Sequence, residues 1–299
     1  MTVPPGPQPA GAQPARTLRG KYGVIDYDAV AVNRTFHDHE CHYYDQRFAI
    51  VHDAQTARQA VAEVEGLLGR RLVAGERVLD VGCGTGYLAA GIRRARPDVD
   101  VVGSDLSSGM LDRARAAGAW PLVQGDATGL PVRAGSVDLV VARGVLHHLP
   151  DVRAALAEWR RVLRPGGAVV LLSEPTPQVE QHGAVVVRLL FAVLRSGELP
   201  AEEHGWEMAS MASNLHVFTA AELADLARAA GFAQVELSTS DFLDTLLITA
   251  SYVTWGRAPA VARLVPWRTA DALARLLDRV VVHRLLPERF RHTVVGVLR

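Results

Sequence analysis

The chain has 299 residues, of which 49% are hydrophobic and 21% are charged, and its 32 basic residues balance its 32 acidic ones. This is ordinary globular composition, and the balanced charge gives no sign of nucleic-acid binding. Two cysteines, and no apolar run of roughly eighteen residues, predict a cytoplasmic protein without a disulfide or a membrane span.

The first part of the chain divides into a tail and a cap. Residues 1–20 are rich in Pro, Gly, Ala and Gln and lack the apolar core of a signal peptide, so we expect a disordered tail. Residues 21–71 become helical, and we interpret them as an N-terminal helical cap. Within this cap the run Phe36–Asp45 is dense in metal-binding side chains. Its spacing matches no standard zinc pattern, and we expect no metal.

From residue 72 onward, short β-branched runs alternate with helical stretches. The expected strands are Arg77–Val81, Val99–Ser104, Pro121–Gln124, Leu139–Ala142, Ala168–Leu172, Gln234–Ser238 and Leu246–Ala250. The expected helices are Tyr87–Arg96, Ser108–Ala117, Asp151–Leu163 and a helix that opens with a capping box at Thr219–Glu222. This pattern predicts an α/β fold over residues 72–250. Its core is a Rossmann-like, mostly parallel sheet of seven strands with helices on both faces.

Two segments depart from this alternation. Residues 176–215 contain Phe191, Trp206, Met208 and Met211, and we interpret them as a substrate lid, with plain core packing as the alternative.

Residues 251–299 form the second such segment, a C-terminal helical extension. It contains a Leu/Val helical face that runs from Leu273 to Val281. Because prolines divide the extension, we expect this face to be buried within the protein or in a homodimer. Peripheral contact with an anionic membrane is the other interpretation, since basic amphipathic helices bind such surfaces.

A glycine loop with three acidic residues indicates the ligand. The first expected strand leads into Gly82–Gly86 and a helix, which lets the backbone approach a ligand closely. Alone, such a loop is also found in NAD-binding domains. Asp80 before the loop would repel a pyrophosphate but suit an ammonium group. Asp105 ends the next strand, where a carboxylate can accept both ribose hydroxyls, and Asp126 follows the strand after that.

These motifs and three others, taken in order, resemble the class I S-adenosylmethionine-dependent methyltransferases of the type 11 group, which includes the quinone-biosynthesis C-methyltransferases. The segments that carry the resemblance are Val78–Gly86, Gly103–Ser107, Gln124–Ala127, Asp138–Val141, Leu146–Leu149 and Leu163–Gly167. The resemblance covers roughly residues 72–238. It implies S-adenosylmethionine as the cofactor.

The resemblance also implies which residues bind the cofactor. They are Tyr44, Asp80, Gly82, Gly84, Gly86, Asp105, Leu106, Asp126, Ala127, Ala142 and Arg143. By analogy with the family, Asp80 and the glycines would hold the methionine half, Asp105 the ribose, and Asp126 the adenine amino group.

Three further residues are candidates for catalysis. Methyl transfer depends on alignment, and some acceptors also need a base. His147 and His148 are candidate bases because they follow the strand that ends at the cofactor, although a packed and hydrogen-bonded turn is the alternative. Glu174, at the end of the fifth strand, is a candidate for orienting an acceptor hydroxyl or amine, or else for capping a turn.

The acceptor itself is identified only by class. The segment that begins Ala142-Arg143-Gly144-Val145 lacks the Pro-Pro-aromatic signature of enzymes that methylate nucleic-acid bases, so we expect no nucleic-acid partner. We expect a small apolar acceptor (a secondary metabolite, a quinone or a lipid-like molecule), with O-methylation favoured over C- or N-methylation. The alternatives are a cofactor-binding cyclase or rearrangement enzyme that transfers no methyl group, and a non-catalytic partner subunit.

Overall fold

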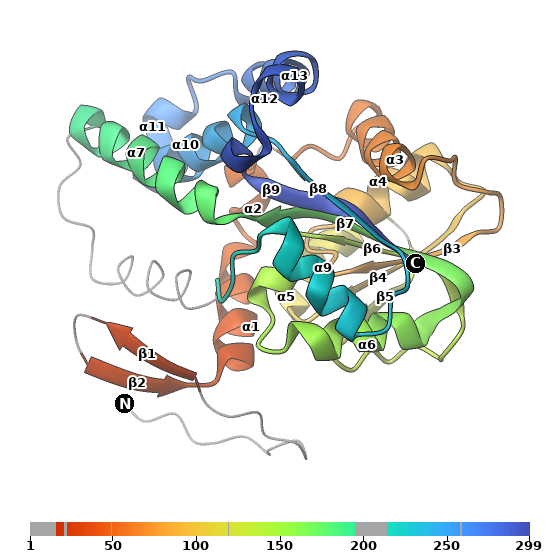
Figure 1. Ribbon diagram of the computed structural model, residues 1–299. Coiled ribbons are helices and arrows are strands. Elements are labelled where there is room, and N and C mark those ends of the chain that lie inside the picture. Colours follow the sequence, from red (N-terminus) through yellow and green to blue (C-terminus); the bar gives the residue numbers. More distant parts are fainter. Residues whose placement is uncertain (1–15, 21–22, 49, 119, 195–213, 258) are drawn as a thin grey trace.

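The computed structural model describes residues 16–20, 23–48, 50–118, 120–194, 214–257 and 259–299, and a central sheet organises them (Figure 1). Its strands are β3 (Arg77–Val81), β4 (Asp100–Asp105), β5 (Leu122–Gln124), β6 (Val137–Arg143), β7 (Leu163–Pro175), β8 (Val235–Ser240) and β9 (Thr293–Leu298). The order is β5-β4-β3-β6-β7-β9-β8, in which β9 pairs antiparallel with β7 and β8 and the other pairs are parallel. The predicted Rossmann-like sheet of seven strands is confirmed.

Helices cover both faces of this sheet (Figure 1). On one face lie α3 (Ala54–Leu68) and α4 (Tyr87–Ala95), which bury Val64 and Ile92 against the strands. On the other face lie α6 (Val152–Val162) and α9 (Ala220–Ala229), which bury Trp159 and Leu223. The helix α5 (Ser108–Ala117) follows β4. Because β3, β4 and β6 are parallel and adjacent, their carboxyl ends meet at one edge of the sheet.

The N-terminal segment forms a small sheet and two helices. β1 (Arg16–Gly20) pairs with β2 (Gly23–Tyr27), so the expected disorder of the tail is wrong for Arg16–Gly20, while residues 1–15 lie outside the described residues. The helices are α1 (Ala29–Glu40) and α2 (Tyr44–Arg47). Asp38 of α1 accepts hydrogen bonds from the Ser107 hydroxyl at 2.6 Å and the Gly109 N–H at 2.9 Å. These bonds attach α1 to the first turn of α5.

The last strand of the sheet lies elsewhere than predicted. The expected strand Leu246–Ala250 is wrong, because these residues lie within the helix α10 (Leu243–Arg257), and the seventh strand is β9. A short apolar run does not distinguish a helix from a strand by its period alone. At Gly296 a Cβ atom would clash with the Glu236 carbonyl oxygen of β8, so the glycine permits the close approach of these strands. The sheet therefore extends beyond the expected boundary at residue 250.

The remaining helices are α7 (Pro177–Leu194), α11 (Pro259–Ala262), α12 (Trp267–Leu277) and α13 (His283–Leu285), with a π-helical turn at Asp278–Val282. The first residues of the expected lid form α7, whereas Trp206, Met208 and Met211 lie outside the described residues. In the described part of the chain, no helix has both the length and the apolar character to span a bilayer. The expectation that the chain buries the Leu/Val face against its own core is wrong, since Leu273 is 54% and Leu276 is 55% exposed.

Candidate cofactor and acceptor site

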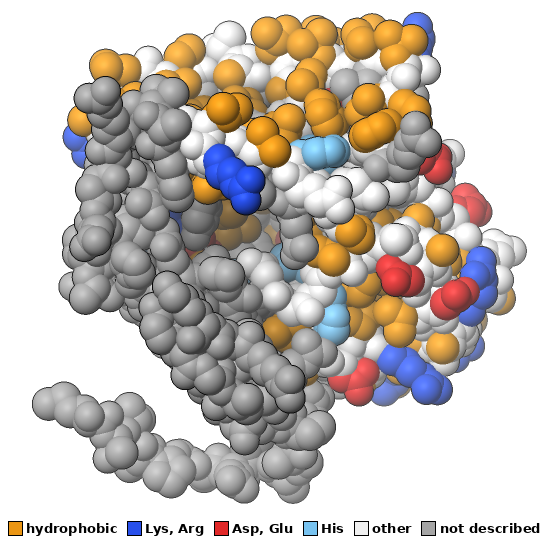
Figure 2. Space-filling model, turned by 60° about the vertical axis from the view of Figure 1, so that its left-hand side comes forward, with side chains coloured by type: hydrophobic (Ala, Val, Ile, Leu, Met, Phe, Trp, Pro, Cys, Tyr) orange, Lys and Arg blue, Asp and Glu red, His pale blue; other side chains and the backbone are white. Residues whose placement is uncertain are grey.

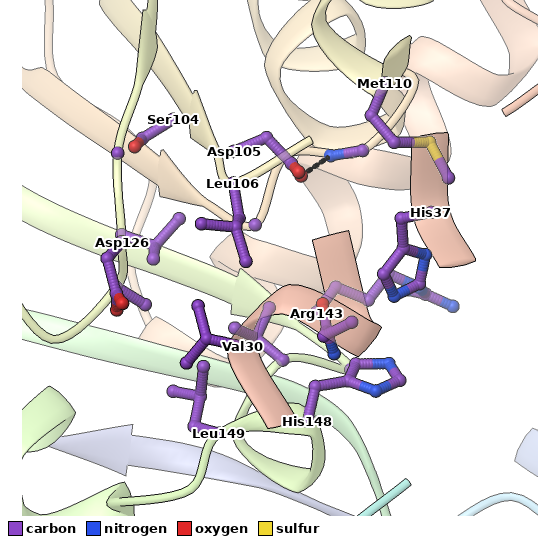
Figure 3. Close-up of a pocket in the computed structure, with 18 of the residues that line it drawn as sticks. Val30, His37, Ser104, Asp105, Leu106, Met110, Asp126, Arg143, His148 and Leu149 are labelled. Carbon is purple, nitrogen blue, oxygen red and sulfur yellow. Dashed lines mark hydrogen bonds between the residues drawn. The ribbon is translucent and has the colours of Figure 1, made fainter. Parts of the chain in front are cut away.

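A cavity of about 780 Å³ opens at the edge of the sheet where β3, β4 and β6 end. This volume includes space that is open to solvent. Asp126 lies at one end, and Arg143 and His37 lie at the other, with Leu106 between them (Figure 3). The helix α1 crosses the opening and contributes Val30 to the wall.

Asp105 and the glycine loop form one wall of the cavity. The Asp105 carboxylate accepts a hydrogen bond from the Gly84 N–H at 2.8 Å (Figure 3) and another from the Ser107 N–H at 2.9 Å. Burial raises the pKa of Asp105, and these two bonds oppose the rise. Gly84 has a φ of +53°, and a Cβ atom there would meet nothing within 4 Å. The bare backbone beside a carboxylate fits the ribose and methionine portions of the expected cofactor.

The opposite end of the cavity fits a flat ring with a polar edge. Leu106 and Leu149 line the cavity on this side (Figure 3). Asp126 stands at its edge, held by the Thr128 N–H at 2.8 Å and the Thr128 hydroxyl at 2.7 Å. Apolar side chains around one carboxylate suit an adenine ring and its amino group.

The structure brings together eight of the eleven expected cofactor-binding residues. The residues that line the cavity are Tyr44, Gly82, Gly84, Asp105, Leu106, Asp126, Ala127 and Arg143. Asp80, Gly86 and Ala142 do not line it. Ala142 is fully buried within the sheet. At Gly86 a Cβ atom would lie 2.8 Å from the Trp120 ring, so this glycine is needed for packing behind the loop.

Asp80 lies beneath the glycine loop. It is 2% exposed, and its carboxylate accepts a hydrogen bond from the Ala89 N–H in α4 at 2.9 Å. Burial raises the pKa of Asp80 from 3.8 to about 8, and the hydrogen bond from Ala89 offsets only part of this effect. Asp80 therefore anchors the first turns of α4, and the direct contact expected with an ammonium group stays a prediction.

We expect Asp80 to make the cofactor-free protein less stable as the pH rises. The pKa of Asp80 is higher in the folded state than its unfolded value of 3.8, so the folded state binds the Asp80 proton more tightly. The stabilisation that this proton gives the folded state is lost as the pH rises from about 4 to about 8. At 1.36 kcal/mol per pKa unit, the free energy of unfolding should fall by about 3 kcal/mol from pH 5 to pH 8 through this group.

The substitution Asp80→Asn should abolish this loss, because the amide still accepts from the Ala89 N–H but does not titrate. Urea unfolding of both proteins at the two pH values measures the difference, with the exposed Asp112→Asn as the control. If the free energies of unfolding of Asp80→Asn and the parent protein differ by the same amount at both pH values, Asp80 is not the group that causes the loss of stability.

Arg143 lies at the end of an ion-pair network. Its guanidinium pairs with Glu63 of α3 and lies 4.9 Å from the centre of the Tyr87 ring. Glu63 also pairs with Arg275 of α12 at 3.2 Å, and Arg275 pairs with Asp271 at 2.9 Å. Burial alone would lower the pKa of Arg143, but Glu63 outweighs it and holds the pKa above its usual value. The positive charge at this end of the cavity is thus fixed by contacts that reach the C-terminal helices.

The paired histidines have different surroundings. His148 lines the cavity, and its ring lies 5.0 Å from that of His37, edge to face (Figure 3). His147 does not line the cavity. Its Nδ1 lies 3.1 Å from the Glu174 carboxylate, and its ring lies 3.9 Å from that of His148. Of the two expected bases, His148 has the position to meet an acceptor, and His147 lies behind it.

Glu174 holds the turn that carries both histidines. It is fully buried, and its carboxylate accepts hydrogen bonds from the N–H groups of Val145 at 2.8 Å, Leu146 at 2.9 Å and His147 at 3.2 Å. A register shift between β7 and β9 and a φ of +56° at Ser173 precede it, and such irregularities redirect side chains. Glu174 does not line the cavity, and of the two roles considered from the sequence, orienting the acceptor or capping a turn, these hydrogen bonds match the capping of a turn.

Sequence reasoning missed the contribution of α1. Val30, Asn33 and His37 all line the cavity from one face of this helix. Their spacing of three and then four residues is the signal that would have revealed them. Asn33 is 8% exposed, and its side-chain nitrogen has no hydrogen-bond partner among the residues that the structure describes. A buried amide of this kind is suited to bind a ligand oxygen.

Comparisons with known proteins place the chain among methyltransferases. The family described as "Methyltransferase domain" matches residues 79–171, and the protein-L-isoaspartate(D-aspartate) O-methyltransferase family matches residues 25–117. A demethylmenaquinone methyltransferase from Deinococcus radiodurans is 40% identical over 163 residues, which are 52% of this chain and 67% of that protein. A malonyl-[acyl-carrier protein] O-methyltransferase from Hahella chejuensis is 39% identical over 116 residues, which are 36% of this chain and 41% of that protein.

A solved structure supports the fold. It is a complex between the Trm112 methyltransferase activator and a methyltransferase from Haloferax volcanii, with a TM-score of 0.54 and 21% identity. The match covers 91% of this chain and 96% of that one. The chain thus spans two thirds of the Deinococcus relative and less than half of the Hahella relative. It belongs to the class I S-adenosylmethionine-dependent methyltransferases of the type 11 group, and its cofactor is S-adenosylmethionine.

Proposed function

We propose that the protein transfers the methyl group of S-adenosylmethionine to an oxygen of a small apolar molecule that carries an ionisable hydroxyl group. The make-up of the cavity wall carries this proposal. Val30, Val145 and Leu149 are apolar, whereas Asn33 and His148 add a hydrogen-bond donor and a group able to accept a proton. An apolar ring with a hydroxyl group matches this combination.

The residues of the protein would position the acceptor and take the proton from its hydroxyl group. When bound, S-adenosylmethionine supplies an electrophilic methyl group on a sulfonium. Val30 and Leu149 both line the cavity and would pack against an apolar ring. The Asn33 amide would donate to an acceptor oxygen. His148 would take the hydroxyl proton as the oxygen–carbon bond forms, which makes the acceptor oxygen the stronger nucleophile.

Glu174 and His147 would keep His148 in place. Glu174 binds the N–H groups of the turn, and the His147 ring packs against that of His148. A base must lie within hydrogen-bond reach of the proton that it removes, so a rigid turn favours transfer. Neither Glu174 nor His147 touches the acceptor in this proposal.

A quinone-type acceptor is the second candidate. The observation that favours it is the Deinococcus relative, a demethylmenaquinone methyltransferase that is 40% identical to this chain over 163 residues. A reduced quinone is an apolar ring with ionisable hydroxyl groups, and therefore meets the requirements of the same wall. The Hahella relative, an O-methyltransferase by name, favours oxygen as the methylated atom.

Product analysis tests the proposal. The protein is incubated with S-adenosylmethionine carrying a labelled methyl group, together with a reduced demethylmenaquinone or an apolar phenol. Mass spectrometry then follows the label, and NMR locates it on oxygen or carbon. We expect a product one methyl group heavier and an equal amount of S-adenosylhomocysteine. A rearranged acceptor of unchanged mass, or cofactor binding without turnover of any such acceptor, would refute methyl transfer to this class.

Asn33→Ala should raise the KM for the acceptor by about tenfold, since one hydrogen bond to a partly charged oxygen contributes about 1.5 kcal/mol. The dissociation constant of S-adenosylmethionine, measured by calorimetry, should stay unchanged. Arg34→Ala, on the exposed side of the same helix, is the matched control. If the cofactor affinity falls while the KM of the acceptor does not change, the amide binds the cofactor and the proposed acceptor contact is wrong.

A further inference from the structure

The C-terminal helices display an apolar surface to solvent. We define this C-terminal apolar surface by six side chains: Leu264, Leu273, Leu276, Val280, Val281 and Leu285. Their exposed fractions range from 40% at Val281 to 83% at Leu264. In Figure 2 hydrophobic side chains gather along the upper edge of the molecule, where Figure 1 places α12 and α13. An exposed cluster of this kind marks an interaction surface.

The rest of the molecule holds this surface in place. Ala274 is buried on the inner side of α12, and the neighbouring Arg275 pairs with Glu63 of α3. Asp278 is 2% exposed, and its carboxylate accepts hydrogen bonds from the Leu243 N–H at 3.0 Å and the Asp244 N–H at 2.9 Å. The helix thus turns its polar anchors inward and its leucines outward. The outward face is a fixed feature of the fold.

The charge around the C-terminal apolar surface indicates which kind of partner binds there. Residues 257–299 contain nine arginines and three acidic residues. Two of the acids point inward, since Asp271 pairs with Arg275 and Asp278 is buried. Arg263 and Arg284 are exposed, and each is adjacent in sequence to an exposed leucine of the surface. The surface therefore combines apolar side chains with positive charge.

A second copy of the chain fits this surface poorly. A two-fold interface brings the same patch of both subunits together, so it would gather the Arg263 and Arg284 side chains of both copies in one interface. An anionic lipid surface instead offers acyl chains to the leucines and negative head groups to the arginines. Charge complementarity thus favours the lipid.

We propose that the C-terminal apolar surface docks the protein on anionic lipid membranes. Leu273, Leu276 and Leu285 enter the interface between head groups and acyl chains, while Arg263 and Arg284 contact lipid phosphates. This docking is independent of the identity of the methyl acceptor, because none of these side chains lines the cofactor cavity.

Vesicle flotation with the full chain tests the docking. One set of vesicles consists of phosphatidylcholine, and in the other set part of this lipid is replaced by anionic phosphatidylglycerol. We expect the protein to float with the anionic vesicles and to dissociate as the salt concentration rises. The triple substitution of Leu273, Leu276 and Leu285 by serine should weaken binding at least tenfold. Val73→Ser, at an equally exposed hydrophobic residue before β3, should leave it unchanged.

A charge variant tests the contribution of the two arginines to docking. Arg263→Gln combined with Arg284→Gln should abolish the preference for anionic vesicles, whereas Arg228→Gln on α9 should preserve it. Circular dichroism and cofactor binding by calorimetry establish that each variant is folded. Three results would overturn the proposal: no flotation of the parent protein, equal flotation of the triple variant, or a dimer in solution that the triple variant converts to a monomer. The last result would assign the surface to a second copy.

Discussion

Replacement of Asp105 by alanine should weaken S-adenosylmethionine binding by at least tenfold. In the proposed binding mode the carboxylate accepts hydrogen bonds from the ribose hydroxyls, and a hydrogen bond to a charged group contributes about 1.5–3 kcal/mol. The same side chain accepts the Gly84 N–H at 2.8 Å, so its removal also loosens the glycine loop. Calorimetry of the purified proteins measures the loss.

Asp112→Ala provides the control for this substitution. Asp112 lies on α5, close in sequence to Asp105, and its side chain is 74% exposed, so cofactor affinity should not change. Asp105→Asn separates charge from shape, because the amide keeps the volume but loses the negative charge. Equal affinity for all four proteins, or tight NAD binding by the parent protein, would show that Asp105 does not hold the ribose of S-adenosylmethionine.

Replacement of His148 by alanine should lower kcat by about 10²–10⁴-fold with little change in cofactor affinity. Such a loss is typical when a positioned base is removed. The loss should shrink at high pH, where the acceptor hydroxyl ionises without help. Initial rates with a phenolic or quinol acceptor, measured across a range of pH, follow both effects.

His147→Ala and His42→Ala are the comparisons that isolate the base. His147 lies behind His148 on Glu174, so its removal should cost less activity than removal of His148. His42 is exposed on the N-terminal cap and should tolerate alanine. If His148→Ala retains more than a tenth of the activity at every pH, alignment alone drives the reaction and no base operates at this position.

Much of the fold was predictable because the motifs fix local geometry. The run from Val78 to Gly86 specifies a strand, a tight turn and a helix start within a few residues, and the structure forms all three. Asp105 is the last residue of β4 and Asp126 lies two residues after the end of β5, so their meeting at one edge of a parallel sheet needs no long-range information. The capping box at Thr219 likewise marks the start of α9 as predicted.

The C-terminal part was not predictable because distant residues determine it. The N-terminal end of α10 is capped by Asp278, whose carboxylate binds N–H groups that lie 34 to 36 residues earlier in the chain. No local pattern around Leu246 indicates this cap, so the apolar run by itself predicts a strand. The position of β9 is likewise set by distant residues, because this last strand of the chain lies between β7 and β8 in the sheet.

The candidate site divides in the same way. Its cofactor half follows from motifs, whereas its acceptor half depends on which side of a turn each histidine occupies. Glu174 decides this by binding three consecutive N–H groups and the His147 ring nitrogen. Residue order alone does not distinguish His147 from His148, and the pairing of β7 with β9 that aims Glu174 is a long-range contact.

The position of β9 has a consequence for synthesis on the ribosome. Chains emerge from their N-terminal end, so β7 and β8 are made well before Thr293–Leu298, the strand that lies between them. Until that strand arrives, β7 presents an open edge of unpaired N–H and C=O groups, which can pair with other nascent chains. The helices α10 to α13 must be translated during this interval. A chaperone that binds exposed strand edges would protect the growing chain at this stage, and a ribosome that stalls within these helices would release a fragment prone to aggregate.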